Sequence, residues 1–328
     1  MKESDIRPAD LLNKYLELCA EDAVTYFGSS HREDISCPAC TGTSIQPAFM
    51  KQDFGYVVCK TCGTLYNSPR PSEEDFVHFY ERSISARYWA KTFLPSVAEA
   101  RRIHLFRPKV EEIARLCKNK KFSPEVVADV GAGHGLFLDE WQRRFPGTKA
   151  IAIEPNPDSA EICRSKNITV VEGFVEQATD LHGQIDMVVA QEVIEHVYDP
   201  MAFSCSLKNL LRDGGRLLLT GQTVDGFDIQ VLWEESKSIY PPNHINFISV
   251  RGFKQLFTRA GFSKIDIFTP GKLDVDIVKN AVAHKPHIVT GQRFIGHLLK
   301  RDEKIVQAFQ KFLQENQLSS HCWIWAEK

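Results

Sequence analysis

Long apolar runs are missing from this 328-residue sequence, and so is an excess of either charge. No stretch approaches the roughly 18 apolar residues of a bilayer-spanning helix, and the start, MKESDIRPAD, lacks the apolar centre of a secretory signal. Forty Lys and Arg balance 42 Asp and Glu, a net charge of −2, so no global positive field favours nucleic acid or an anionic membrane. We therefore expect a cytoplasmic globular protein with no membrane partner and, at about 150 residues per domain, about two domains.

The nine cysteines lack the even, regular arrangement of a secreted disulfide framework. Four of them form two CxxC pairs with eighteen residues between the pairs: Cys37, Cys40, Cys59 and Cys62. Four thiolates at this spacing are typical of tetrahedral Zn²⁺, and because four sulfurs fill the coordination shell, the metal is expected to be structural. A redox dithiol or an unmetallated remnant does not explain two matched pairs. The other five cysteines are expected to be inert thiols in a reducing compartment.

Apolar periodicity and turn residues divide the chain into segments. We expect an N-terminal helical segment at 1–34, a β-rich zinc ribbon at 35–70, linking helices at 71–122, and one α/β domain at 123–328 that contains a substrate-side insert at 221–249 and a helical insert at 274–317. From Pro124 onwards strands and helices alternate, which predicts a mostly parallel sheet with helices on both faces and a ligand site at the carboxyl ends of the strands.

Three helix details are specific. Asp10 is expected to cap the first helix, and Ser72 to cap a helix that begins with three acidic residues. A helix from Val97 to Lys118, kinked or divided at Pro108, is expected to bury one face: Ile103, Phe106, Val110, Ile113 and Leu116.

A glycine-rich turn follows the first predicted strand of the α/β domain, in the sequence from Asp129 to Gly135. Its spacing is GxGxG rather than the GxGxxG of dinucleotide folds, and an acid at the strand end would serve a pyrophosphate poorly, so a ligand without phosphate is favoured. Glu154 ends the next strand nineteen residues beyond Gly135, where a carboxylate can bind ribose hydroxyls.

Together with the stretches Asp186 to His196 and Gly214 to Thr220, these motifs closely resemble the class I S-adenosylmethionine-dependent methyltransferases, and the terminal strand Cys322 to Ala326 is similar to that family's reversed last strand. The resemblance implies a Rossmann-like, seven-stranded α/β sheet with helices on both faces, and S-adenosyl-L-methionine as cofactor. The glycines would line its methionine half, Glu154 its ribose, Gly173 and Phe174 its adenine, and Gln191 and Glu192 its methyl group. The full set of implied cofactor contacts is Asp129, Gly131, Ala132, Gly133, Gly135, Glu154, Pro155, Gly173, Phe174, Gln191 and Glu192.

The cysteine pairs, the sequence from Gly63 to Tyr80 and the stretch Pro241 to Ser249 resemble a subgroup of these enzymes that carries a zinc ribbon and is associated with sugar, polysaccharide or natural-product modification. The resemblance implies a small-molecule acceptor, with a sugar or related hydroxyl favoured.

Transfer to a hydroxyl is helped by a base that removes its proton. The catalytic candidates are His196, His244 and Glu195, and for each histidine the alternative is a hydrogen bond that holds its turn or loop. If residues 192–196 were helical, Glu192, Glu195 and His196 would share a face. Similar quinone-pathway O-methyltransferases bind a divalent ion through such a cluster, but Gln191 replaces a further acid, which counts against a second metal.

Two residue groups have open interpretations. The aromatics Tyr80, Tyr88, Trp89 and Phe93, with the stretch Phe227 to Tyr240, form either a packing core, which we favour, or a lid over the acceptor. The basic cluster Arg101, Arg102, Arg107 and Lys109 either binds a phosphate or is a solvated helix face.

An RNA methyltransferase whose ribbon grips nucleic acid is the alternative function, and a non-catalytic cofactor-binding scaffold is another. The ribbon is not basic, which counts against RNA, since its charges within 31–62 balance: Arg32, Lys51 and Lys60 against Glu33, Asp34 and Asp53. The intact glycine turn and Glu154 count against a scaffold. The sequence leaves the oligomeric state open.

Overall fold

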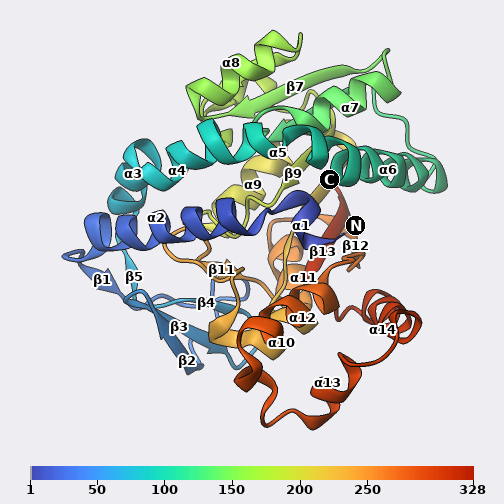
Figure 1. The fold of residues 1–328 in the computed structure, drawn as a ribbon. Helices are drawn as coiled ribbons and strands as arrows, with labels where there is room; N and C mark the ends of the chain where they lie inside the picture. The colour runs from blue at the N-terminus through green and yellow to red at the C-terminus, as the bar shows by residue number, and fades with distance from the viewer. Residues whose placement is uncertain (1) are drawn as a thin grey trace.

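A seven-stranded sheet forms the centre of the protein, which we describe over residues 2–328 in a computed structural model (Figure 1). In sheet order the strands are β12 (Ser263–Phe268), β13 (His321–Glu327), β10 (Leu211–Gln222), β9 (Ile185–Gln191), β6 (Val126–Val130), β7 (Lys149–Glu154) and β8 (Thr169–Glu172). Strands β10, β9, β6, β7 and β8 run parallel, whereas β13 is antiparallel to both of its neighbours. This arrangement confirms the predicted fold class, including the reversed last strand.

Both faces of the sheet are buried, as expected for parallel strands. Successive side chains of β9 show the alternation: Met187 and Val189 join one apolar cluster, while Val188 and Ala190 join the other. Helices α6 (Arg107–Asn119) and α7 (Leu136–Arg144) pack on the first face, and α9 (Pro200–Leu210) and α11 (Val250–Arg259) on the second. Helix α8 (Pro157–Ser165) covers β7 and β8.

A second sheet contains the cysteine-rich segment. Its order is β11 (Asn246–Phe247), β4 (Leu65–Asn67), β3 (Phe54–Cys59) and β2 (Ile45–Lys51). A separate pair joins β1 (Arg32–Glu33) to β5 (Arg70–Pro71). Because β11 comes from the stretch 221–249, the cysteine-rich sheet is completed by the segment expected to lie beside the acceptor. The segment boundaries proposed from the sequence stay a prediction.

The N-terminal and linking helices differ from the expected pattern in two details. Helix α2 (Ala9–Phe27) has Pro8 at its N-cap, so Asp10 lies in its first turn and is not the cap. The linker divides before Pro108, at a π-helical turn η2 (Arg102–Phe106) between α5 (Leu94–Arg101) and α6. The wider π-helical turn changes the direction in which its side chains point. Ile103 is therefore 38% exposed and does not lie on the buried face of the helix. Ser72 caps α3 (Glu73–Arg82) as predicted, since its side chain accepts from Asp75 N.

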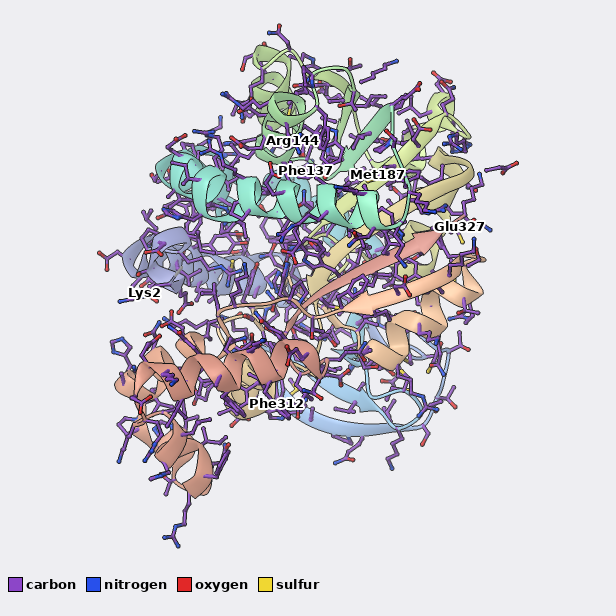
Figure 2. The ribbon with its side chains drawn as sticks, turned by 90° about the vertical axis from the view of Figure 1, so that its right-hand side faces the viewer. Lys2, Phe137, Arg144, Met187, Phe312 and Glu327 are labelled. Carbon is purple, nitrogen blue, oxygen red and sulfur yellow. The ribbon has the colours of Figure 1, made fainter. Side chains whose placement is uncertain are left out.

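The remaining helices connect these elements. They are α1 (Glu3–Ile6), α4 (Ile84–Tyr88), η1 (Trp89–Phe93), η3 (Val175–Gln177), η4 (Thr179–Leu181), α10 (Phe227–Leu232), η5 (Trp233–Glu235), α12 (Asp274–His284), η6 (Pro286–Val289), α13 (Arg293–Leu298) and α14 (Glu303–Glu315). The blue N-terminal helices lie between the α5–α6 rod and the orange-red helices of residues 274–317 (Figures 1 and 2). Hydrogen bonds join α1 to α12, from Glu3 N to Asp276 Oδ2 at 2.9 Å and from Asn280 Nδ2 to Glu3 Oε2 at 3.1 Å.

Candidate functional site

The glycine turn after β6 holds its three motif glycines in a backbone region that other residues rarely adopt. φ is +71° at Gly131, +53° at Gly133 and +64° at Gly135. Space is restricted as well, because a Cβ atom on Gly131 would lie 2.7 Å from the Val193 side chain and one on Gly135 would lie 2.9 Å from Cys163 Sγ. The turn therefore lets a ligand approach the main chain closely at the carboxyl end of β6.

Glu154 ends β7 beside this turn. Its Oε2 accepts a hydrogen bond from Gly133 N at 2.7 Å, and its Oε1 accepts one from Asn156 N at 2.9 Å. The side chain is buried, and burial raises its pKa while the two N–H donors lower it. Gly173 N donates to Glu154 O at 3.2 Å, and the following Phe174 ring is 48% exposed. The other two candidates at this edge are Ala132, half-buried, and Pro155, exposed.

Two polar side chains lie at the neighbouring ends of β6 and β9. Asp129 is buried, and burial raises its pKa to about 7 against the opposing effect of Gln191. Asp129 Oδ1 and Gln191 Oε1 have no hydrogen-bond partner among residues 2–328. Buried polar atoms are nearly always paired, so these two oxygens are acceptors available to a ligand.

Glu192 follows β9 in a strained conformation, with φ at +54°. Thr220 Oγ1 donates to Glu192 Oε1 at 2.9 Å, and Glu192 N donates to Thr220 O at 2.8 Å. His321 Nδ1 lies 3.3 Å from the same Oε1 atom, while its Nε2 accepts from Trp323 Nε1 at 2.9 Å. Burial lowers the pKa of His321 to about 4 against the attraction of Glu192, so the neutral ring donates through Nδ1.

His321 was missed by the sequence analysis, although the alternation of the last strand offered a signal. In the antiparallel register His321 pairs with Gln222, at the carboxyl end of β10. A reversed last strand therefore begins where the parallel strands end, so its first polar residue lies at the edge that carries the site.

His196 and His244 lie against each other, with ring centroids 4.6 Å apart and planes at 76°. His244 Nδ1 donates to Ser238 O at 2.7 Å, which leaves its Nε2 as an acceptor, and Tyr240 stacks on the ring at 4.0 Å. His196 Nδ1 has no hydrogen-bond partner among residues 2–328. Burial lowers the pKa of His196 to about 4 and that of His244 well below its usual value, so both rings are neutral at pH 7.

The shared helical face considered for Glu192, Glu195 and His196 is wrong, because residues 194–196 form a turn. Glu195 is fully buried, and its Oε1 accepts from Gln222 N. Its backbone oxygen accepts from Ile245 N and Asn246 N at 2.9 and 3.2 Å. Glu195 thus joins this turn to the loop that carries His244, while Glu192 faces His321.

The cysteine-rich sheet holds the His244 loop from the other side. Tyr56 OH donates to His244 O at 2.6 Å, and Asn67 N donates to Ile245 O at 2.9 Å. The buried Arg70 donates to Asn246 Oδ1 at 2.8 Å and to Tyr198 O at 2.6 Å. Each of these bonds joins residues far apart in the sequence, so the position of His244 depends on the cysteine-rich segment.

The four cysteines are placed as zinc ligands would be. Their sulfur atoms all lie within 4.8 Å of one another, with Cys37 to Cys62 at 3.6 Å and Cys40 to Cys59 at 3.5 Å. A tetrahedral ion with Zn–S distances of about 2.3 Å needs sulfur pairs about 3.8 Å apart, so the donor set fits Zn²⁺. Ser249 Oγ donates to Cys62 O at 2.6 Å, which links this cluster directly to the end of the His244 loop.

A small cavity lies over the carboxyl end of β10. Its volume is about 30 Å³, about one water's share of liquid volume. Its lining includes Arg7, Tyr15, Trp89, Gln222, Lys237 and Tyr240. Trp89 stacks on the buried Phe93 at 4.2 Å, and Tyr15 packs on Trp89 and Tyr240 at 4.8 and 5.6 Å. The aromatics therefore form a packing core, as favoured, and two of them also border the cavity.

Among residues 2–328, the cysteine cluster is the one group of three or more Cys, His, Asp or Glu side chains close enough to hold a metal ion together. Within the same residues, no helix combines the length and the apolar character that crossing a membrane requires.

Comparisons with known proteins agree with this geometry. The family described as "Methyltransferase domain" matches residues 99–267. The ubiquinone biosynthesis O-methyltransferases of Xanthomonas campestris pv. campestris and Xanthomonas euvesicatoria pv. vesicatoria are 31% and 30% identical over 118 residues, which are 33% of this chain and 48% of each relative. The chain thus spans about half the length of these relatives. The structure of the plantazolicin methyltransferase BpumL in complex with SAH has a TM-score of 0.51 at 13% identity, over 77% of this chain and 93% of that one.

The fold, the glycine turn and the family match together identify the class: the chain belongs to the methyltransferase domain family, with the architecture of class I S-adenosylmethionine-dependent methyltransferases. This confirms the family predicted from the sequence motifs.

Proposed function

We propose that this protein transfers the methyl group of S-adenosyl-L-methionine to a hydroxyl group of a small-molecule acceptor. The observation that carries the proposal is the pair of neutral histidines, His196 and His244, at the carboxyl end of β9 in a methyltransferase fold. A neutral imidazole can take a proton from a hydroxyl at pH 7, and a hydroxyl is the acceptor group that needs this help.

The cofactor is assigned to the edge formed by β6, β7 and β9. Glu154 would accept hydrogen bonds from the ribose hydroxyls, and the main chain of Gly131 to Gly135 would follow the methionine half. The unpartnered oxygens of Asp129 and Gln191 can accept hydrogen bonds from its ammonium group. Gly173 and Phe174 stand at the adenine end. When bound, the cofactor supplies an electrophilic methyl group on a sulfonium.

The protein then has to align the acceptor oxygen with that methyl group and exclude water. Alignment alone lowers such a barrier by several kcal/mol. Glu192, fixed by Thr220 and His321, borders the reacting groups. His196 or His244 would take the hydroxyl proton as the methyl carbon passes from the sulfonium sulfur, which leaves as a thioether, to the acceptor oxygen. Glu195 holds the His244 loop from the interior, and we assign it no proton transfer.

A structural Zn²⁺ on Cys37, Cys40, Cys59 and Cys62 is part of the proposal, because the donor set fits it. The ribbon's contacts go to the His244 loop, which favours a role in shaping the acceptor site over gripping RNA. The names of the relatives support oxygen as the methylated atom. A sugar or natural-product hydroxyl remains our prediction for the acceptor, and RNA remains the alternative.

The direct test has two steps. Calorimetry with S-adenosylhomocysteine on the full chain should show one binding site, and absence of binding by both this product and S-adenosylmethionine would contradict the proposal. Methyl-deuterated S-adenosylmethionine is then incubated with hydroxyl-bearing sugars, nucleotide sugars, phenols and RNA, and the products are analysed by mass spectrometry. Label on RNA alone would favour the alternative.

A further inference from the structure

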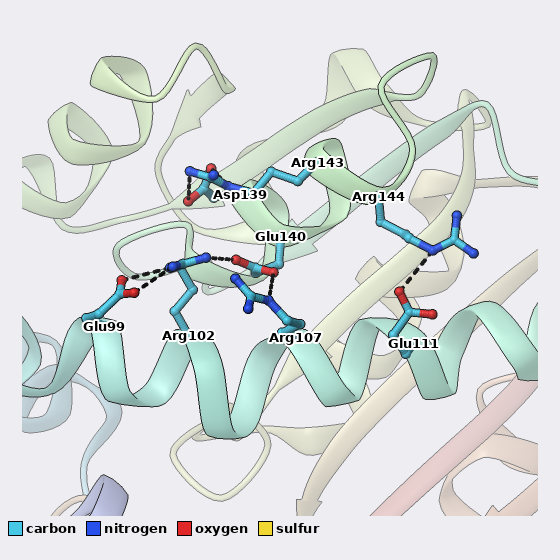
Figure 3. Close-up of polar contacts among 8 residues, drawn as sticks. All are labelled: Glu99, Arg102, Arg107, Glu111, Asp139, Glu140, Arg143 and Arg144. Atoms are coloured by element: carbon cyan, nitrogen blue, oxygen red, sulfur yellow. Dashed lines mark hydrogen bonds and ion pairs between the residues drawn. The ribbon is translucent and has the colours of Figure 1, made fainter.

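The basic cluster of the linking helices divides into two pairs. Arg102 and Arg107 face α7, where both donate to the buried carboxylate of Glu140, and Arg102 also pairs with Glu99 (Figure 3). These two arginines are therefore satisfied within the protein. Arg101 and Lys109 take no part in this network.

Arg101 and Lys109 are instead held over aromatic rings, one of which, Trp89, borders the cavity. The Arg101 guanidinium lies 6.0 Å from the ring centres of Trp89 and Phe106, and Lys109 Nζ lies 6.0 Å from those of Phe106 and Trp323. Neither forms an ion pair with any residue from 2 to 328, and Arg101 Nε has no hydrogen-bond partner there. Lys109 is only 6% exposed. An unpaired buried cation is costly, so such groups are usually kept for a ligand.

A third cation comes from the N-terminal segment. Arg7, immediately after α1, lines the cavity together with Trp89 and Tyr240. Arg101 lies over Trp89, which borders the same cavity as Arg7. Burial, together with repulsion by Arg7, lowers the pKa of Arg101 to about 10. The lining also contains Lys237, which donates to Asn13 at 2.8 Å, and Glu3, which accepts from Asn280 at 3.1 Å, so two cations and one carboxylate border the cavity.

The charges at this end of the cleft do not balance. Burial lowers the pKa of Lys109, and the attraction of Glu192 opposes this shift. Glu192 also attracts Arg101 and Arg7, so three cations share its single carboxylate. Binding of the cofactor adds no net negative charge to this region, because its sulfonium and ammonium groups outnumber its single carboxylate.

We propose that Arg7 and Arg101 form an anion subsite for the acceptor, so that the molecule methylated carries a carboxylate or phosphate group beside its hydroxyl. This inference rests on the methyl transfer proposed above and names its substrate class. The N-terminal segment then closes over a bound acceptor and contributes a recognition residue to it.

The test uses the full chain saturated with S-adenosylhomocysteine, in a buffer free of phosphate and carboxylates. Calorimetry measures binding of inorganic pyrophosphate, of 4-hydroxybenzoate, and of phenol, which lacks only the carboxylate. The variant is Arg7→Gln with Arg101→Gln. Its matched control is Arg107→Gln, which removes an exposed arginine of the same helical rod from the opposite face.

We expect the wild type to bind one of the two anions. If the subsite recognises a carboxylate, phenol should bind at least tenfold more weakly than 4-hydroxybenzoate. The double variant should bind the anion at least tenfold more weakly than the wild type does. Charged hydrogen bonds have this magnitude. Arg107→Gln should leave the affinity unchanged. Pyrophosphate binding alone would identify a phosphate acceptor.

Two results would overturn the subsite. The first is that the wild type saturated with S-adenosylhomocysteine binds neither anion. The second is a double variant with lower affinity for S-adenosylhomocysteine and unchanged affinity for the anion, which would assign the arginines to the cofactor. Failure of the proposed function looks different. In that case the wild type does not bind S-adenosylhomocysteine. If the unloaded protein still binds the anion and the double variant does not, the anion subsite is supported although the methyl transfer is not.

Discussion

The proposed cofactor side and the proposed acceptor side of the site are built in different ways. On the cofactor side, the glycine turn, Glu154 and Gly173 follow successive strands, and they contact one another through short loops. On the acceptor side, Arg7, Trp89, His244 and His321 come from the N-terminal segment, the linker, the 221–249 stretch and the last strand.

This difference separates two kinds of dependence. The cofactor side depends on one sheet and its local turns, so distant changes should leave it intact. The acceptor side depends on contacts among segments, including a sheet shared between the cysteine-rich segment and the His244 loop. A substitution in any one of these segments should therefore lower kcat more than it lowers the affinity for the cofactor.

Loss of Cys62, a proposed zinc ligand, should have the largest effect. In Cys62→Ser we expect loss of bound zinc, a fall of more than 10 °C in melting temperature and loss of turnover, because structural zinc contributes roughly 10 kcal/mol or more to folding of such modules. Zinc content, scanning calorimetry and S-adenosylhomocysteine affinity are the measurements.

The affinity for S-adenosylhomocysteine should change less than about threefold. Cys205→Ser, at a half-buried cysteine outside the cluster, is the control and should keep zinc. If Cys62→Ser does not fold, brief chelation of the native protein replaces it. Cofactor binding that disappears together with the zinc would break the distinction between the two sides.

The histidine pair comes next. His196→Ala and His244→Ala should each lower kcat, with the base itself losing about 10²- to 10⁴-fold, while S-adenosylhomocysteine affinity stays within about threefold. The exposed His182→Ala is the control. A double variant with full activity would reject both base assignments.

Glu154→Ala should lower S-adenosylhomocysteine affinity by about 100-fold, since hydrogen bonds to a charged group contribute about 1.5–3 kcal/mol each. Calorimetry measures it. Glu172→Ala is a matched control, because Glu172 sits opposite Glu154 on the adjacent strand and pairs with Arg164 at an exposed site. If both variants lost affinity equally, the loss would come from disturbance of the sheet edge and not from removal of the Glu154 carboxylate.

The pH dependence of kcat/KM tests whether a buried histidine is the base on the acceptor side. Burial lowers the pKa of His196 to about 4, so the base stays unprotonated as the pH falls and the rate should be nearly flat from pH 8 to pH 5.5. A histidine with the usual pKa of about 6.5 would lose roughly tenfold by pH 5.5. An acidic limb centred near 6.5 would contradict a buried histidine base.

The smallest effect concerns the attachment of the 274–317 helices. Asp228 is fully buried without hydrogen-bond partners among residues 2–328, and burial beside Asp274 raises its pKa to about 8. A raised acid pKa gives stability that is present below about pH 4 and is lost as the pH rises through 8. Wild type should thus melt a few degrees lower at pH 9 than at pH 6, and Asp228→Asn should reduce that difference. Asp213→Asn, at an exposed site, should not.

The sequence by itself determined the fold class, the cysteine cluster and the glycine turn. These features depend on residues near one another in the chain: alternating βα units, a glycine turn that requires positive φ at Gly131 to Gly135, and CxxC pairs that must converge to bind a metal. Local sequence carries such information because turn conformation and strand burial are short-range requirements.

Only the tertiary structure decided which polar groups share the acceptor end. Identical residue types in the linker separate, because Arg102 points toward Glu140 of α7 while Arg101 lies over Trp89 without an ion pair. His321 reaches Glu192 only through the antiparallel register of the last strand, and Glu195 leaves the cleft because residues 194–196 turn instead of forming a helix. Each outcome depends on long-range packing and register, which residue spacing does not encode.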